Sequence, residues 1–390
     1  MSAYLACMGS VSEIIQMSPV VHSLRTHGHR VYVLHAGLPQ RQTDQLYEFF
    51  DMEPDARITL LRHQARLSDL TAELLTRMDT HLQHASPDVV LLQGDTTCAM
   101  AGALAASCQD VPVAHLDAGV RTQDQELFPE HMNRALVGRM SRWHFTTSQE
   151  ARQNLMREGA NNGHVHLMGH TSVDAARWAR LRIQNFGLKG FVTPEVQRFL
   201  RLHAHEQLLL VSTQAHEHWG KPLQRLAAAV AGLLQLHPAL TVVWAMPSCP
   251  QAKADVDMGL AAVPADVHRR LCMTGRMSYP QLIQLLDACH FVLADTAPLQ
   301  QAASALQKPV LIAGDQATSH VLVEAGGGMV IGPMAHQIIG QISELLDDPV
   351  LVRSMQSANS PFGDGQAAQH VAEVLSAETE PRMAIRKRAQ

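Results

Sequence analysis

Two short polar runs contain residue types that can move protons, and each run follows an apolar stretch. The run Gln93-Gly94-Asp95-Thr96-Thr97 comes after residues 89–92, and the run His115-Leu116-Asp117-Ala118-Gly119 comes after residues 111–114. Carboxylates and imidazoles are the side chains that most often act as general acids and bases. The carboxyl ends of parallel strands lie at one edge of a sheet, where an open α/β fold binds its ligand. The two runs therefore predict one shared crevice that contains Asp95 and Asp117.

Each of these two carboxylates also has a purely structural interpretation. Asp95 could cap a helix that begins near Thr97, because Asp is favoured at that position. Asp117 could close a turn before Gly119, because Asp side chains accept hydrogen bonds from nearby backbone groups. The residues alone leave both interpretations open.

The composition is that of a globular protein with two cores. A chain of 390 residues exceeds one comfortable core and predicts two domains. Apolar residues make up 46% and charged residues 17%, and the net charge of −5 provides no basic field for nucleic acid. No apolar stretch reaches the roughly 20 residues of a membrane helix, and the first residues lack the basic start of a signal peptide. We therefore expect a cytoplasmic protein that binds neither nucleic acid nor membrane.

Short apolar or β-branched runs alternate with helix-length amphipathic stretches along the whole chain. This rhythm is typical of parallel βαβ units. In the first half, strands are predicted at 3–8, 30–35, 58–61, 88–92, 112–115 and 142–146. After a helical connector at 172–202 the rhythm restarts, with strands predicted at 208–211, 240–244, 270–272, 291–293, 309–312 and 328–330. The pattern predicts an α/β fold of two similar halves with a ligand cleft at their interface.

Several separate motifs, in one order along nearly the whole chain, resemble the non-hydrolysing UDP-N-acetylglucosamine 2-epimerase family. Besides the two polar runs, they are Phe128-Pro129-Glu130 with Asn133-Arg134, the segment 168–174 and the segment 360–367. The resemblance implies a GT-B-like fold, in which two Rossmann-like domains with parallel sheets face across a cleft. The domain limits that we expect are 1–171, 172–366, a helix at 367–378 that crosses back to the first domain, and a frayed tail at 379–390.

The resemblance also implies a reaction. The C2 hydrogen of the sugar is not next to a carbonyl and is too weak an acid for direct removal, so the family expels UDP by elimination and adds it back. This reaction needs a base at C2, an acid near the leaving group and donors on the diphosphate. The catalytic candidates at matching positions are Asp95, Asp117 and His131. The substrate-binding candidates are Gly9, Ser10, Arg134, His216, Glu217, Tyr279, Thr296 and Glu324.

Many of the family's signature positions are substituted in this chain. Val11 stands in place of the Arg that clamps the diphosphate, Gln16 in place of a Lys, and His131 in place of a carboxylate. Pro298 removes one backbone donor from the phosphate-binding turn. One such donor typically contributes ~10²–10³ in rate, so about three losses would erase an enhancement of ~10⁶. We therefore expect a family member with a degenerate active site, in which standard epimerisation is lost or altered.

Two alternative functions stay open. The first is a working epimerase that interconverts UDP-GlcNAc and UDP-ManNAc in polysaccharide precursor synthesis. The second is a binding module for another anionic or carbohydrate ligand. In each case the expected partner is a nucleotide sugar or a related small molecule in the cleft, and a homodimer, which is usual in the family, stays open.

Some candidate residues fit either a functional or a structural role. His131 could replace a carboxylate in a changed reaction, or it could be a polar residue at a helix start. Tyr279 with Pro280 could pack against a base ring or form a turn. Arg121 and Arg134 could contact an anion or form salt bridges.

Neither a metal nor a cofactor is expected. The run His216-Glu217-His218, with His115 and His131, suggests a metal site but lacks the spacing of known zinc motifs. The cysteines are scattered without a Cys-x-x-Cys pair, which favours reduced core thiols over disulfides or zinc. They stand at positions 7, 98, 108, 249, 272 and 289.

Overall fold

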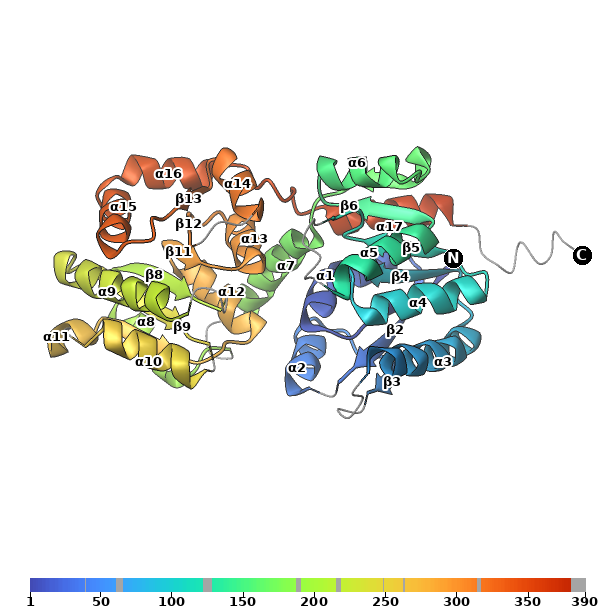
Figure 1. Cartoon of the computed structure of the whole chain (residues 1–390), viewed down its shortest axis with the longest axis horizontal. Helices are drawn as coiled ribbons and strands as arrows, with labels where there is room; N and C mark the ends of the chain where they lie inside the picture. The colour runs from blue at the N-terminus through green and yellow to red at the C-terminus, as the bar shows by residue number, and fades with distance from the viewer. Residues whose placement is uncertain are drawn as a thin grey trace, which may run out of the picture. The chain divides into compact units, whose positions relative to one another are not determined.

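The chain folds into two α/β units, each built on a parallel sheet (Figure 1). The computed structural model describes residues 1–38, 40–60, 66–121, 128–186, 191–214, 219–247, 249–261, 264–313 and 317–379. Within these ranges the two sheets have 7 and 6 strands. Unit 1 contains Met1–Ala175 and the segment from Phe362 onward, and unit 2 contains Ala176–Pro361. The predicted α/β class, with two Rossmann-like parallel sheets, is confirmed.

Unit 1 has the strand order β3-β2-β1-β4-β5-β6-β7. The direction of the order reverses between β1 and β4, and an open α/β sheet has its ligand crevice at such a switch point. The strands are β1 (Ala3–Met8), β2 (Arg30–Gly37), β3 (Ala56–Thr59), β4 (Val89–Gln93), β5 (Val113–Leu116), β6 (Trp143–Thr146) and β7 (Val165–Leu167). The residues that follow β1, β4 and β5 are therefore at the place where a ligand is expected.

The predicted strands of unit 1 agree closely with these bounds, with two exceptions. β3 begins two residues before the predicted start at 58, because its residues alternate between buried and exposed and lack a continuous apolar run. β7 was not predicted, because its three residues are too few to establish a period.

Helices cover both faces of the sheet of unit 1. They are α1 (Val11–Thr26), α2 (Arg41–Phe49), α3 (Leu67–Ala85), α4 (Thr97–Cys108), α5 (Glu130–Met140), α6 (Gln149–Arg157) and α17 (Ala367–Glu378). α4 approaches the sheet closely because it is rich in alanine and glycine: a Cβ on Gly102 would lie 2.9 Å from a methyl group of Leu92 on β4. α17, the last helix, packs against α1, which places the end of the described chain in the first unit.

Unit 2 repeats the same plan, with the strand order β10-β9-β8-β11-β12-β13. Its strands are β8 (Gln207–Ser212), β9 (Leu240–Ala245), β10 (Leu271–Thr274), β11 (Phe291–Ala294), β12 (Val310–Ile312) and β13 (Gly328–Val330). Its helices are α8 (Pro194–Leu202), α9 (Lys221–Leu236), α10 (Pro250–Gly259), α11 (Ala265–His268), α12 (Tyr279–Ala288), α13 (Ala297–Ala305), α14 (Ala317–Glu324), α15 (Ala335–Asp347) and α16 (Pro349–Ser357). Leucine, valine and isoleucine side chains of α9 and α15 form the core of this unit with Trp244 of β9.

The chain leaves unit 1 through α7 (Thr171–Phe186) and re-enters it shortly before α17. The segment that leaves unit 1, at residues 170–174, is hydrogen-bonded to the segment that returns to it, at residues 362–368. The His170 amide donates to the Phe362 carbonyl at 2.7 Å, and the Asp174 carboxylate accepts from the Ala368 amide at 2.9 Å. Gly169 has a φ of +84°, and a Cβ there would lie 2.9 Å from the Phe362 carbonyl oxygen, so this approach requires glycine.

Within the described ranges, no helix combines the length and the apolar character that a membrane crossing requires.

Candidate active site

Asp95 follows β4 and is held by two consecutive residues of α5. The Arg134 guanidinium forms an ion pair with the Asp95 carboxylate at 2.5 Å, and the Asn133 side chain donates to the Asp95 carbonyl at 2.9 Å. The pKa of the Asp95 carboxyl is raised, chiefly by burial. The Arg134 charge opposes this shift, and the negative charges of Asp117 and Glu130 add to it. The effect of the Asp117 charge on the pKa of Asp95 agrees with the prediction that the two residues lie close together.

The structure does not support the interpretation of Asp95 as a helix cap. α4 begins at Thr97, and its N-cap is Thr96, whose hydroxyl accepts from the Ala99 amide at 3.0 Å. The prediction was one residue out, because Asp and Thr are both favoured as caps and stand next to each other. With the capping role taken by Thr96, the Asp95 side chain is directed to Arg134 instead.

Asp117 follows β5 and has a left-handed backbone, with a φ of +59°. A non-glycine residue with this conformation is uncommon and is often found at functional sites. Its carboxylate accepts a hydrogen bond from the Thr147 hydroxyl at 3.3 Å. Asp117 also lines a cavity of about 10 Å³ together with Gln16 and Thr147, which is close to the size of one water molecule.

Gly9 and Ser10, two substrate-binding candidates, form the turn between β1 and α1. A Cβ on Gly9 would lie 1.9 Å from the Ala36 carbonyl oxygen, so only glycine fits there. Ser10 is the N-cap of α1, and its hydroxyl accepts from the Glu13 amide at 3.2 Å. The buried Glu13 carboxylate accepts in return from the Gly9 and Ser10 amides, at 2.9 and 2.7 Å. The chain itself therefore satisfies these two amides.

Glu13 and Gln16 connect α1 to the turn after β4. Glu13 accepts from the Thr96 hydroxyl at 2.6 Å, and Gln16 accepts from the Gln93 side chain at 3.0 Å. Gln16 therefore takes part in the polar network without supplying a charge, and Val11 at the start of α1 supplies none either. The cation that the resemblance leads us to expect near the β1–α1 turn is absent from both of these positions.

His131 lies in the first turn of α5, after Glu130. Its ring is 6.3 Å from the Phe128 ring, measured between centroids. Arg121, the other arginine considered as an anion contact, instead forms a two-pronged ion pair with Glu158, at 2.8 and 2.7 Å. α5 thus brings His131 and Arg134 to the carboxyl edge of the sheet, while Arg121 is taken up by a salt bridge.

The remaining substrate-binding candidates belong to the second half of the chain. Thr296 is the N-cap of α13, Tyr279 is the first residue of α12, and Glu324 is the exposed last residue of α14. Tyr279 with Pro280 therefore begins a helix, and the interpretation of this pair as a simple turn is wrong. His216 and Glu217 lie outside the described residues.

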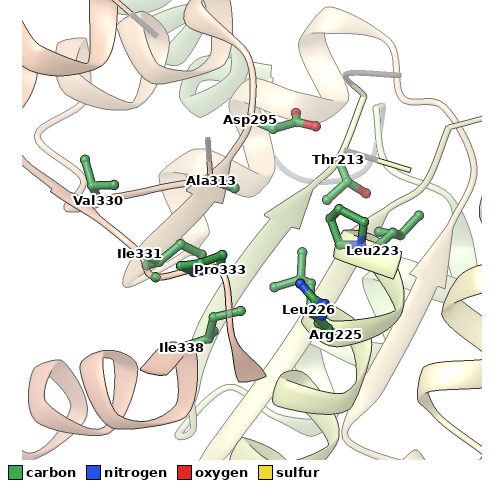
Figure 2. Close-up of a pocket in the computed structure, with 12 residues that line it drawn as sticks. Thr213, Leu223, Arg225, Leu226, Asp295, Ala313, Val330, Ile331, Pro333 and Ile338 are labelled. Atoms are coloured by element: carbon green, nitrogen blue, oxygen red, sulfur yellow. The ribbon is translucent and has the colours of Figure 1, made fainter. Parts of the chain in front are cut away.

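An apolar cavity of about 390 Å³ lies at the carboxyl ends of β8, β11 and β12 in unit 2. Figure 2 shows Leu223 and Leu226 of α9 on one side of it and Ile331 and Pro333 on the other. Two of its three polar lining side chains, those of Thr213 and Asp295, are hydrogen-bonded inside the unit, and the third is Arg225. The Thr213 hydroxyl accepts from Trp244 at 3.1 Å, and the Asp295 carboxylate accepts from the Gln214 amide at 3.0 Å. The volume and the apolar walls are those of a small-ligand site.

Several residues that build the site were given no role in proton transfer or substrate binding from the sequence, although Glu130 and Asn133 belong to a motif quoted above and His115 was considered as a metal ligand. Glu13, His115, Asn133 and Glu130 all contact or influence the turn after β4. A signal was available for Glu13, because Ser10 followed three residues later by Glu is a capping box. The others depend on which helix lies over which strand, which no short-range pattern encodes. Within the ranges that the structure describes, no three His, Cys, Asp or Glu side chains are arranged to hold a metal ion.

Known proteins match this chain over nearly its whole length. A sequence profile described as UDP-N-acetylglucosamine 2-epimerase matches residues 22–376. The UDP-N-acetylglucosamine 2-epimerase of Yersinia pestis is 28% identical over 378 residues, which cover 95% of this chain and 97% of that protein. The co-structure of S. aureus MnaA with UDP has a TM-score of 0.79 at 26% identity, and the match covers 98% of this chain and 99% of that chain.

A third relative supports the fold alone because its identity is lower. UDP-GlcNAc 2-epimerase from Neisseria meningitidis, in its crystal structure with UDP-GlcNAc, has a TM-score of 0.80 at 24% identity, and the match covers 96% of this chain and 100% of that chain. The profile match spans most of the sequence and includes the turns after β4 and β5. The chain belongs to the UDP-N-acetylglucosamine 2-epimerase family.

Proposed function

We propose that this chain interconverts UDP-N-acetylglucosamine and UDP-N-acetylmannosamine by eliminating UDP and adding it back. The observation that carries the proposal is the carboxylate pair at the switch point of unit 1. Asp95 is held by Arg134, and its raised pKa responds to the charge of Asp117. Two carboxyls in different environments, next to each other, are the usual equipment for moving a proton to and from carbon.

The proposed reaction needs two proton-transfer groups. In the elimination, a base takes the proton from C2, the C1–O bond breaks with the electron pair leaving on UDP, and a C1–C2 double bond forms. In the re-addition, UDP attacks C1 and a proton returns to C2 on the opposite face. Because the proton leaves one face and returns to the other, one group cannot perform both transfers. Asp95 and Asp117 supply the two groups in this proposal.

Other candidates have supporting roles in the proposal. His131, in the first turn of α5, donates a proton to the departing diphosphate. Arg134 keeps Asp95 in place and adds positive charge near the site. Gly9, Ser10, His216, Glu217, Tyr279, Thr296 and Glu324 contact the nucleotide sugar. Elimination and re-addition together involve no net oxidation or reduction, so this chemistry requires no redox cofactor.

A second candidate is a family member that binds a nucleotide sugar without turning it over. Two observations favour it: Val11 begins α1 without a charge, and Pro298 lacks an N–H in the first turn of α13. Fewer donors on the departing diphosphate mean less stabilisation of the charge that develops there. Relatives that are 28% identical along their whole length carry the name of the enzyme, which favours the working epimerase.

A proton NMR time course of UDP-GlcNAc with the purified chain in D₂O tests the proposal. The working epimerase incorporates deuterium at C2 and produces the ManNAc signals. Broadened UDP-GlcNAc resonances without deuterium incorporation support the second candidate. An unchanged spectrum at saturating protein would contradict both candidates and leave a binding module for a different ligand. The Asp95→Asn variant is the control for contaminating activity.

A further inference from the structure

Two buried side chains hold the backbone of the turn that carries Asp95. His115 of β5 donates from Nε2 to the Gly94 carbonyl at 2.7 Å, and Asn133 of α5 donates from its amide to the Asp95 carbonyl at 2.9 Å. Each side chain is only 1% exposed. A buried polar side chain is stabilising only when it is hydrogen-bonded, so these contacts are built into the fold.

The chemistry of His115 is fixed by its surroundings. A carbonyl oxygen only accepts, so Nε2 must carry the hydrogen. Burial lowers the pKa of His115 to about 3; the hydrogen bond to the Gly94 carbonyl opposes this shift, and the nearby His144, Arg121 and Arg134 add to it. The ring is therefore neutral near pH 7. Because Nδ1 has no hydrogen-bond partner among the described residues, the bond to Gly94 is what orients the ring.

The turn needs such support because of its backbone. Gly94 has a φ of +69°, in the left-handed region, and the chain must then deliver Thr96 to the N-cap of α4. Asp95 lies between these two constraints. Asn133 and Arg134 are neighbours on α5, so one helix holds both the carbonyl and the carboxylate of Asp95. A turn released by His115 or Asn133 would let the Asp95 carboxylate move away from Arg134.

We propose that His115 and Asn133 are positioning residues, which fix the Gly94–Asp95 turn so that the Asp95 carboxylate stays beside Arg134 and near Asp117. The part of this proposal that concerns turnover rests on the proposed function. The part that concerns the position of Asp95 is a property of the folded chain and can be tested without turnover.

The test is the titration of the Asp95 carboxyl carbon by ¹³C NMR in the full chain, assigned with Asp95→Asn. His115→Leu removes the donor, and His115→Gln keeps an N–H at about the reach of Nε2. His144→Leu is the matched control, because His144 is also buried and is in register with His115 on β6. We expect the Asp95 midpoint to move by about one pH unit or more in His115→Leu, and to stay near the wild-type value in His115→Gln and His144→Leu.

Two results would overturn the proposal. One is an unchanged Asp95 midpoint in a folded His115→Leu protein. The other is an equal displacement in His144→Leu, which would mean that any loss of a buried histidine disturbs the site. Asn133→Leu keeps the test decisive if His115→Leu does not fold, because it releases the next carbonyl of the same turn and has the same expected effect.

Turnover gives a second readout that separates the two proposals. If the chain is a working epimerase, His115→Leu lowers kcat by up to about 10²-fold, because displacement of a catalytic group by about 1 Å costs that much, while KM changes little. His115→Gln restores most of the rate. If wild type turns nothing over, the proposed function fails, and the Asp95 titration still decides whether His115 and Asn133 position the turn.

Discussion

The carboxyl edges of the two sheets occupy the same place in the same fold but have opposite character. In unit 1 the edge carries Asp95, Asp117 and Arg134, and most of the hydrogen bonds around the turn come from side chains of other elements. In unit 2 the edge opens into an apolar cavity, where Thr213 and Asp295 are already satisfied. The shared fold thus provides two equivalent positions, and only the side chains at the edge of unit 1 are suited to the proton transfer that we propose.

Removal of the Asp95 carboxylate should make the edge of unit 1 as inactive in proton transfer as the edge of unit 2. We expect Asp95→Asn to lower the rate of C2 deuterium exchange by about 10²–10⁴-fold, the usual contribution of an acid or base. The measurement is the NMR time course in D₂O. Asp257→Asn, on the exposed surface of α10, is the control and should keep the wild-type rate. Equal rates in the two variants would show that proton transfer does not depend on the Asp95 carboxylate.

The second prediction concerns the wall of the cavity in unit 2. Leu226→Ala should lower the free energy of unfolding by about 2–5 kcal/mol, because Leu226 is 6% exposed and its loss enlarges the cavity. Urea unfolding followed by Trp fluorescence measures the change. Leu236→Ala on the same helix removes a side chain that is 62% exposed and should change stability by less than about 0.5 kcal/mol. A similar cost for both variants would mean that the cavity wall is not part of the core.

The third prediction concerns Asp174, whose carboxylate accepts from the Ala368 amide and so joins the segment that leaves unit 1 to the segment that returns to it. Burial raises the pKa of Asp174 from 3.8 to about 6, and the charge of Asp364 adds to the shift. Between about pH 4 and pH 6 the folded state holds a proton that the unfolded state has released, so the contribution of Asp174 to stability falls as the pH rises. A shift from 3.8 to about 6 corresponds to about 3 kcal/mol over that window.

Asp174→Asn should remove this fall in stability. Urea unfolding at pH 4.5 and pH 7 measures it, and Asp347→Asn at the exposed end of α15 serves as the control. If the control and Asp174→Asn showed the same pH dependence, the carboxyl of Asp174 would not be the group responsible.

The smallest effect is expected at an ion pair of unit 2 that resembles the Asp95–Arg134 pair. Arg180 contacts Asp287 at 2.7 Å, but the two side chains are 41% and 27% exposed. Solvent weakens such a pair, so Arg180→Ala should lower stability by only about 0–1 kcal/mol. Arg134→Ala should cost little stability too but should raise the pKa of Asp95, because it removes the charge that opposes the shift. Thermal unfolding and the Asp95 titration distinguish the two pairs.

Much of the fold could be predicted from the sequence because its strands are buried on both faces. β4 and β8 are continuous apolar runs, and their predicted positions differ from the observed bounds by one residue. β3 was misplaced because one of its faces is exposed, and β7 was missed because it is short. Complete burial is not required, however, because the partly exposed β13 was also predicted at its observed bounds.

The candidate site was predictable only in part. The rule that parallel strands end at one edge brought Asp95 and Asp117 together correctly. The Asp95–Arg134 pair and the His115–Gly94 bond were not predictable, because they join residues 39 and 21 positions apart through the packing of α5 and β5. The uncharged Val11 and Pro298, which has no N–H, are visible in the sequence, and the structure places them in the first turns of α1 and α13.

The position of α17 has a consequence for biosynthesis. The helix that packs against α1 in unit 1 is made after all of unit 2, and Tyr4 on β1 donates to the carbonyl of Leu375 near the end of this helix. At ribosomal rates of about 5–20 residues per second, the segment between the two parts of unit 1 takes on the order of 10–40 s to synthesise. During that interval residues 1–175 lack the helix that packs against α1 and accepts the Tyr4 hydrogen bond. Unit 2 can thus finish folding before unit 1, although it is translated second.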